Sequence, residues 1–255
     1  MPADTQLSIL DSAMTAWRDA LAARERMPNL FWTVLAALLI LNLIGLGAGA
    51  LSWFAGAIYA IVQGFVLLPL LVVTPLAIPV HRFILLGETN DNYAIDTQNP
   101  RFMRFFLISV ALSAILTIPS LVSIALVFLA PILSGIVSAL LGIIAAIISI
   151  RTVILFPSIA VDAPGADWRN SMADTKGHSW RVFFIFLVTF LPVAIAVVVL
   201  AFIFEHIPAI GWIFIVAIQS VADIFLIAAA AALASRLYAA FANQLGRPAG
   251  VSAPR

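Results

Sequence analysis

Few side chains in this sequence have the types and spacing that enzymatic chemistry requires. The 255-residue chain has no cysteine, which excludes disulfides, thiolate metal sites and cysteine nucleophiles. Its three histidines, His81, His178 and His206, cannot form one site, because the predicted topology places His206 on the opposite side of a membrane from the other two. The sequence contains no nucleophile elbow, zinc-protease motif or P-loop. We therefore expect no catalytic residue, no cofactor, no metal site and no enzymatic activity.

The ionisable residue that lies deep inside an apolar stretch is Asp223, and Gln219 precedes it by one helical turn. A helical rise of ~1.5 Å per residue places Asn42 and Thr117 at a similar depth, near the middle of a bilayer. These four residues form a candidate midplane polar site. Intramembrane carboxyl groups are functional candidates, but a neutral, hydrogen-bonded aspartic acid that aligns neighbouring helices explains the same pattern. Both alternatives are open on the sequence alone.

Three arginines, Arg82, Arg151 and Arg236, each close a long apolar stretch and are followed by further apolar or aromatic residues. An arginine in this position can hold a lipid phosphate through two parallel hydrogen bonds. It can also serve as a simple anchor, with its aliphatic stem in the bilayer and its charge at the surface. We treat the three as candidate contacts to anionic lipid headgroups.

The composition is that of an integral membrane protein. Hydrophobic residues make up 64% of the chain and charged residues 10%, and the mean hydropathy is +1.14. Soluble globular domains are about half apolar and about a quarter charged. The composition therefore excludes a soluble enzyme, a disordered protein and a nucleic-acid-binding protein, and the net charge of +1 gives no strongly basic surface.

Three apolar blocks without Lys or Arg define the part that crosses the membrane. The blocks are Leu30–Val80, Phe105–Ile150 and Val182–Ala234. Each can hold two helices of ~20 residues and a turn, but not three. We predict an all-α, polytopic membrane protein with six transmembrane helices arranged as three hairpins, at residues 30–86, 102–162 and 180–241. The expected turns are near Leu51–Phe54, Leu129–Pro131 and Glu205–Pro208.

The distribution of positive charge sets the predicted orientation. All 13 Lys and Arg residues lie before, between or after the three apolar blocks, so they share one side of the membrane. Because cytoplasmic loops are enriched in Lys and Arg, both termini are predicted to be cytoplasmic. Residues 1–29 then form a cytoplasmic amphipathic segment, 30–241 the transmembrane domain, and 242–255 a disordered cytoplasmic tail.

Short cytoplasmic helices are expected beside the transmembrane domain. One apolar stripe at helical spacing contains Leu7, Leu10, Met14, Trp17 and Leu21. A helix with this stripe can lie in the headgroup region or dock on a soluble partner. A second short helix is predicted after Asp167, which can cap its start, and Gly177 is expected to end it. The polar loop 87–100 is interpreted as a solvated connector.

Several segments resemble the interface motifs of a large set of bacterial six-helix membrane proteins. The best match covers about residues 150–182, with RTVILFPSIAVD beginning at Arg151 and KGHSWR beginning at Lys176. His81-Arg82-Phe83 and Ser235-Arg236-Leu237-Tyr238 are similar to the other two motifs. The set includes the membrane domain attached to some glycerophosphodiester phosphodiesterases. The resemblance implies a bacterial inner-membrane location and a hairpin architecture, and it carries over no catalytic residue or soluble phosphodiesterase domain.

These features predict a non-enzymatic integral inner-membrane protein that binds lipid or a partner protein through its cytoplasmic face. Its expected partners are the phospholipid bilayer and anionic lipid or another membrane protein, with no nucleic acid. The alternative is a small transporter or ion-coupled carrier that uses the midplane site around Asp223. A third alternative is an accessory subunit of a larger membrane assembly.

Overall fold

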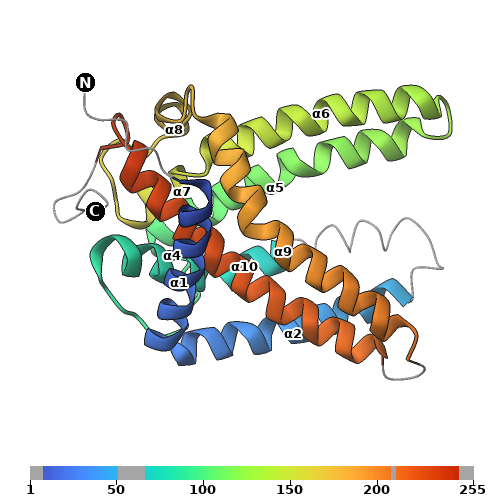
Figure 1. Ribbon diagram of the computed structural model, residues 1–255, viewed down its shortest axis with the longest axis horizontal. Coiled ribbons are helices and arrows are strands. Elements are labelled where there is room, and N and C mark those ends of the chain that lie inside the picture. The colour runs from blue at the N-terminus through green and yellow to red at the C-terminus, as the bar shows by residue number, and fades with distance from the viewer. Residues whose placement is uncertain (1–7, 51–66, 208–210, 247–255) are drawn as a thin grey trace.

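The computed structural model describes residues 8–50, 67–207 and 211–246, and the side chains of these residues except 46–50. Within these ranges every regular element is a helix, which confirms the predicted all-α class (Figure 1). The elements are α1 (Ile9–Arg26), α2 (Pro28–Ala50), α4 (Leu67–Leu86), α5 (Pro100–Leu126), α6 (Pro131–Thr152), α7 (Leu155–Ala160), α8 (Trp168–Asp174), α9 (Ser179–Glu205) and α10 (Gly211–Phe241).

Six described helices, α2, α4, α5, α6, α9 and α10, are long and apolar enough to cross a membrane. This agrees with the prediction of an integral, multi-pass membrane protein. Helix α5 packs along α6, and α9 packs along α10, which also contacts α1, α2 and α4 (Figure 1). The predicted turn at Leu129–Pro131 falls where α5 gives way to α6, and α9 ends at Glu205. The turn expected at Leu51–Phe54 lies outside the described residues.

The buried core lies toward the end of the bundle that contains the arginines. It is built mainly from α1, α7, the second half of α4 and the second half of α10. The α5–α6 pair extends away from this core (Figure 1) and exposes large apolar side chains such as Leu116, Ile136 and Leu140. Such a surface is stable in lipid, because lipid tails are as apolar as these side chains.

Helix α1 packs across α9 and α10 through small residues. Its buried residues are alanines that recur every three or four positions: Ala13, Ala16, Ala20 and Ala23. Small side chains allow helix backbones to approach closely. Three large residues of the predicted apolar stripe, Leu10, Met14 and Leu21, are instead 60%, 44% and 47% exposed. The remaining apolar surface of α1 therefore faces away from the chain, and Leu7 lies outside the described residues.

Trp17 is the remaining described residue of that stripe. Unlike the other three, it points toward the rest of the protein and links α1 to α9. Its indole Nε1 donates a hydrogen bond to the main-chain oxygen of Thr189, at 3.1 Å. Thr189 precedes Pro192 by three residues, and a proline inside a helix disturbs the hydrogen bonds of the preceding turn. Trp17 thus supplies a donor to a carbonyl beside a proline in a helix long enough to span the membrane.

The first residues of the predicted C-terminal tail are folded, which corrects the expectation of disorder from residue 242. The carboxylate of Asp174 in α8 accepts hydrogen bonds from the main-chain N–H groups of Asn243, Gln244 and Leu245, at 2.9, 2.9 and 3.0 Å. Leu245 is fully buried. Residues 247–255 lie outside the described residues.

Candidate functional site

Three of the four residues predicted to form the midplane polar site lie together. The Asp223 carboxylate accepts hydrogen bonds from Gln219 Nε2 at 2.6 Å and from Asn42 Nδ2 at 3.5 Å. Asn42 Nδ2 also donates to Ser220 Oγ at 3.0 Å. Among the described residues no basic side chain forms an ion pair with Asp223. The cluster therefore joins α2 to α10 through neutral donors.

The fourth predicted member, Thr117, forms no hydrogen bond with this cluster. Its hydroxyl donates to the main-chain oxygens of Ser113 and Ala114 in its own helix, at 2.9 Å each. Helix α5 packs against α4, α6 and α7. Thr117 matches Asp223 in expected depth, but its helix faces other neighbours.

Two of the three predicted arginines flank a buried hydrogen bond that joins α4 to α10. His81 Nδ1 and Ser235 Oγ are 2.8 Å apart, and both side chains are buried. Arg82 and Arg236 are the next residues of the two helices, so this contact helps to fix both. Arg236 Nε and Nη2 donate to the two carboxylate oxygens of Asp19 in α1, at 2.7 and 3.0 Å.

Arg82 also meets carboxylates within the chain. Its Nε donates to Glu88 Oε2 at 2.8 Å, and its Nη1 lies 3.9 Å from an oxygen of Asp162. Arg101 at the start of α5 donates to both carboxylate oxygens of Asp162. Asp162 has a φ of 53°, in the left-handed region that aspartate enters more readily than most residues. One short turn after α7 thus joins the ends of α4 and α5.

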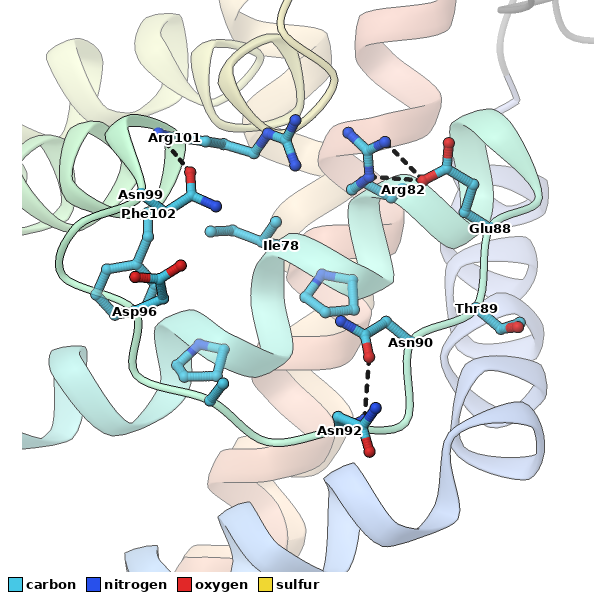
Figure 2. Close-up of a pocket in the computed structure, with 13 residues that line it drawn as sticks. Ile78, Arg82, Glu88, Thr89, Asn90, Asn92, Asp96, Asn99, Arg101 and Phe102 are labelled. Carbon is cyan, nitrogen blue, oxygen red and sulfur yellow. Dashed lines mark hydrogen bonds and ion pairs between the residues drawn. The ribbon is translucent and has the colours of Figure 1, made fainter.

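A polar pocket of about 380 Å³ lies between α4 and the loop 87–99 (Figure 2). Arg82 and Arg101 line one side of it, and Asn90 and Asn92 line the other. Because Arg82 is paired with Glu88 and Arg101 with Asp162, the pocket offers no unmatched guanidinium to a ligand.

The loop 87–99 is tied to the helices, although its polarity predicts a solvated connector. The Asp91 carboxylate accepts the main-chain N–H of Leu30 at 2.9 Å and thereby caps the start of α2. The Tyr93 hydroxyl donates to the main-chain oxygen of Val72 at 3.4 Å, three residues before a proline of α4. Burial raises the pKa of the Tyr93 hydroxyl above its ordinary value, so the group keeps its proton.

Arg151 differs from the other two predicted arginines, because no carboxylate of the described residues forms an ion pair with it. Its Nη2 donates to the main-chain oxygen of Met172 at 2.5 Å, and its Nε is buried without a hydrogen-bond partner. The Arg151 carbonyl accepts the hydroxyls of Ser171 and Thr175 at 3.0 Å each. Helix α8 therefore caps the end of α6 and holds the Arg151 side chain in place.

Arg151 also lines an apolar groove of about 510 Å³ between α6 and the start of α9. The large apolar side chains of the groove are Ile143, Ile147, Ile150, Trp180 and Phe183. The residue before α9, His178, makes no side-chain hydrogen bond to the first turn. The N–H groups of Ser179 and Trp180 at the start of that turn have no carbonyl partner within the helix, and the turn carries the positive end of the helix dipole. The groove thus combines apolar surface, a guanidinium without a carboxylate partner among the described residues, and a helix N-terminus.

Sequence reasoning does not identify the acidic partners that the structure assigns to the arginines. Asp19 and Asp162 are distant in sequence from the arginines that they contact, whereas Glu88 lies only six residues after Arg82. A general signal is present, because the chain has 12 acidic residues beside its 13 basic ones, and most of both lie in the same predicted cytoplasmic segments. That signal indicates pairing without giving the pairs.

Comparison with known proteins yields no relative. No family model matches this chain, and the searches of curated proteins and of solved structures also find no match. The function is therefore argued from the residues and contacts described above.

Proposed function

We propose that this chain is a non-enzymatic membrane protein of a bacterial inner membrane, with both termini in the cytoplasm, that binds lipid or a partner protein through its cytoplasmic face. Of these two ligand classes, we favour anionic lipid. The observation that carries the proposal is the position of the packed core, which gathers at the end of the bundle that contains the arginines. A chain that only spans a membrane has no need for a folded layer at one end.

The charges support this orientation. Every Lys and Arg lies in the segments that flank the three apolar blocks, and cytoplasmic segments are those enriched in these residues. The similarity of residues 150–182 to bacterial six-helix membrane proteins supports the inner-membrane location.

The exposed face of α1 supports a lipid ligand. Leu10, Met14 and Leu21 are exposed, and Arg18 and Arg24 are also exposed on the same helix. Apolar and basic side chains on one helix suit the headgroup region of an anionic membrane. The same surface is compatible with a soluble partner, and the experiment separates the two ligands.

The test is mass spectrometry of lipid and protein that copurify with the full chain after gentle solubilisation. We expect anionic phospholipid to be enriched in the purified sample relative to the membrane from which it was extracted. A stoichiometric protein without lipid enrichment would replace the lipid proposal with the partner proposal. Recovery of neither would overturn both.

A transporter or ion-coupled carrier is the second candidate, and the observation in its favour is the carboxyl group of Asp223. This residue sits in a span-length helix with only neutral hydrogen-bond donors around it. A group in that setting can exchange a proton or accept a cation. Against this, Asn42 and Gln219 already satisfy the carboxylate, which is the arrangement that a purely structural aspartic acid requires.

A further inference from the structure

We infer that the groove between α6 and α9 is a binding site for one anionic phospholipid, with the phosphate at Arg151 and an acyl chain along α6. This inference rests on the proposed lipid-binding function and locates the lipid-binding site in this groove. The sequence offers Arg82, Arg151 and Arg236 as equivalent candidates, and the structure separates them.

The three arginines differ in whether an internal carboxylate neutralises their charge. Arg82 donates to Glu88, and Arg236 is held by both carboxylate oxygens of Asp19. A phosphate at either arginine would have to displace an internal carboxylate or lie close to it, and like charges repel. Arg151 has a carbonyl as its hydrogen-bond partner and no ion pair among the described residues. Its positive charge is therefore available to an anion.

The surroundings of Arg151 also favour an anion. Partial burial removes a guanidinium from water, and a buried donor without a partner is costly. Arg151 Nε is such a donor, and because protein atoms cover it, it contributes unmatched positive charge beside the groove and not a direct hydrogen bond to a ligand. The first turn of α9 adds positive potential next to the groove, since Ser179 and Trp180 form part of its wall. Helix N-termini with free N–H groups are frequent phosphate sites in proteins.

The shape and the apolar lining of the groove fit an acyl chain. Ile143, Ile147 and Ile150 lie three to four residues apart on α6, so they form one apolar stripe that leads toward Arg151. Trp180 is 76% exposed at the edge of the groove and packs against Phe183, with ring centroids 6.0 Å apart. The volume of about 510 Å³ lies within the range of small-molecule pockets. A free phosphate would use the charge but leave this stripe uncovered, whereas a phospholipid uses both.

The test is native mass spectrometry of the full chain with phosphatidylglycerol or phosphatidylcholine of identical acyl chains. We expect the wild-type protein to retain phosphatidylglycerol more strongly. Arg151→Gln should weaken that retention about tenfold, the loss expected for one charge-assisted hydrogen bond, and bring it to the phosphatidylcholine level. Arg169→Gln removes the same charge from the exposed surface of α8 and should change nothing.

Two further variants keep the inference testable if Arg151→Gln does not fold. Arg151→Lys retains the charge and should preserve most of the selectivity for phosphatidylglycerol. Ala146→Leu narrows the groove without altering charge and should lower the retention of both lipids. A headgroup without acyl chains, glycerophosphoglycerol, should compete weakly, and equal competition would overturn the role of the apolar stripe.

The outcomes also separate this inference from the proposed function. If the wild-type chain retains phosphatidylglycerol selectively, but Arg151→Gln and Ala146→Leu retain it equally well, the lipid-binding function holds and the groove is the wrong site. If the wild-type chain shows no preference for phosphatidylglycerol, both the site and the lipid-binding proposal fail.

Discussion

The ion pair between Arg236 and Asp19 should hold α1 on the rest of the protein, and its removal should release α1 selectively. Both oxygens of Asp19 accept hydrogen bonds from the guanidinium of Arg236. The pair joins residues 217 positions apart in the chain. We expect Asp19→Asn and Arg236→Gln each to weaken the docking of α1 against α10.

The magnitude follows from the burial of the pair. The side chain of Arg236 is 38% exposed and that of Asp19 is 19% exposed. Fully exposed ion pairs contribute ~0.2–1 kcal/mol, and loss of one partner of a buried pair costs ~3–5 kcal/mol. Solvent screening at Arg236 places this pair nearer the lower limit, so we expect each substitution to lower the free energy of α1 opening by about 1–2 kcal/mol.

The assay is amide hydrogen exchange of the full chain in detergent or nanodiscs. A change of about 1–2 kcal/mol should speed exchange in α1 roughly 5- to 30-fold while leaving α5 and α6 unchanged. The double variant Asp19→Asn/Arg236→Gln should lose less than the sum of the single variants, because the pair is absent after either change. Asp11→Asn, on the exposed surface of α1, is the matched control. Additive losses, or equal acceleration in all helices, would refute the assignment of this pair as the anchor of α1.

Three further predictions test topology, the midplane cluster and the aromatic donor of α1. Single cysteines at Ala130 and His206 should react with impermeant thiol reagents from outside the cell, and one at Met172 only after permeabilisation; external labelling at Met172 would reject the predicted orientation. Asp223→Asn keeps one acceptor oxygen, which retains the 2.6 Å hydrogen bond from Gln219, so the variant should still fold; loss of proton-coupled flux in the folded variant would support the transporter, and unchanged flux would leave the residue a structural role. Trp17→Phe should lower the stability of α1 docking by about 1 kcal/mol in the same exchange assay, and unchanged protection would show that the hydrogen bond to α9 contributes nothing.

The membrane-spanning helices could be predicted because each is encoded by a long run of apolar residues, so that no single residue decides the prediction. An apolar block of about twice the length of a single span leaves little freedom in how many helices it holds. The connection after α5 ends at Pro131, where the sequence signals a break, and the small helix after Asp167 begins with the predicted cap, whose carboxylate accepts the N–H of Arg169 at 3.0 Å. Such signals are local and do not depend on which helices become neighbours.

The hydrogen-bond partners of polar residues depend on the rotation of each helix about its axis and on which helices are neighbours. The hydropathy pattern predicts neither of these. Its expected depth makes Thr117 a candidate for the midplane site, but the Thr117 hydroxyl forms its hydrogen bonds within α5. Ser220 lies one residue from Gln219, and it joins the cluster because the same face of α10 meets α2. The sequence predicts how deep a residue lies in the membrane. Whether its side chain forms a hydrogen bond to another helix also depends on how its own helix is rotated about the helix axis.

The division between a cytoplasmic segment 1–29 and a transmembrane domain from residue 30 does not coincide with a break in packing. Ala16, Ala20 and Ala23 of α1 are fully buried against the other helices, and Trp17 donates to a carbonyl of α9 beside a proline. If α1 were absent, that carbonyl would face lipid or the headgroup region without this donor, and the alanine contact surface on α9 and α10 would be exposed. Residues 9–26 therefore complete the helical bundle, and a truncation before Pro28 removes part of its core together with the amphipathic surface that α1 presents.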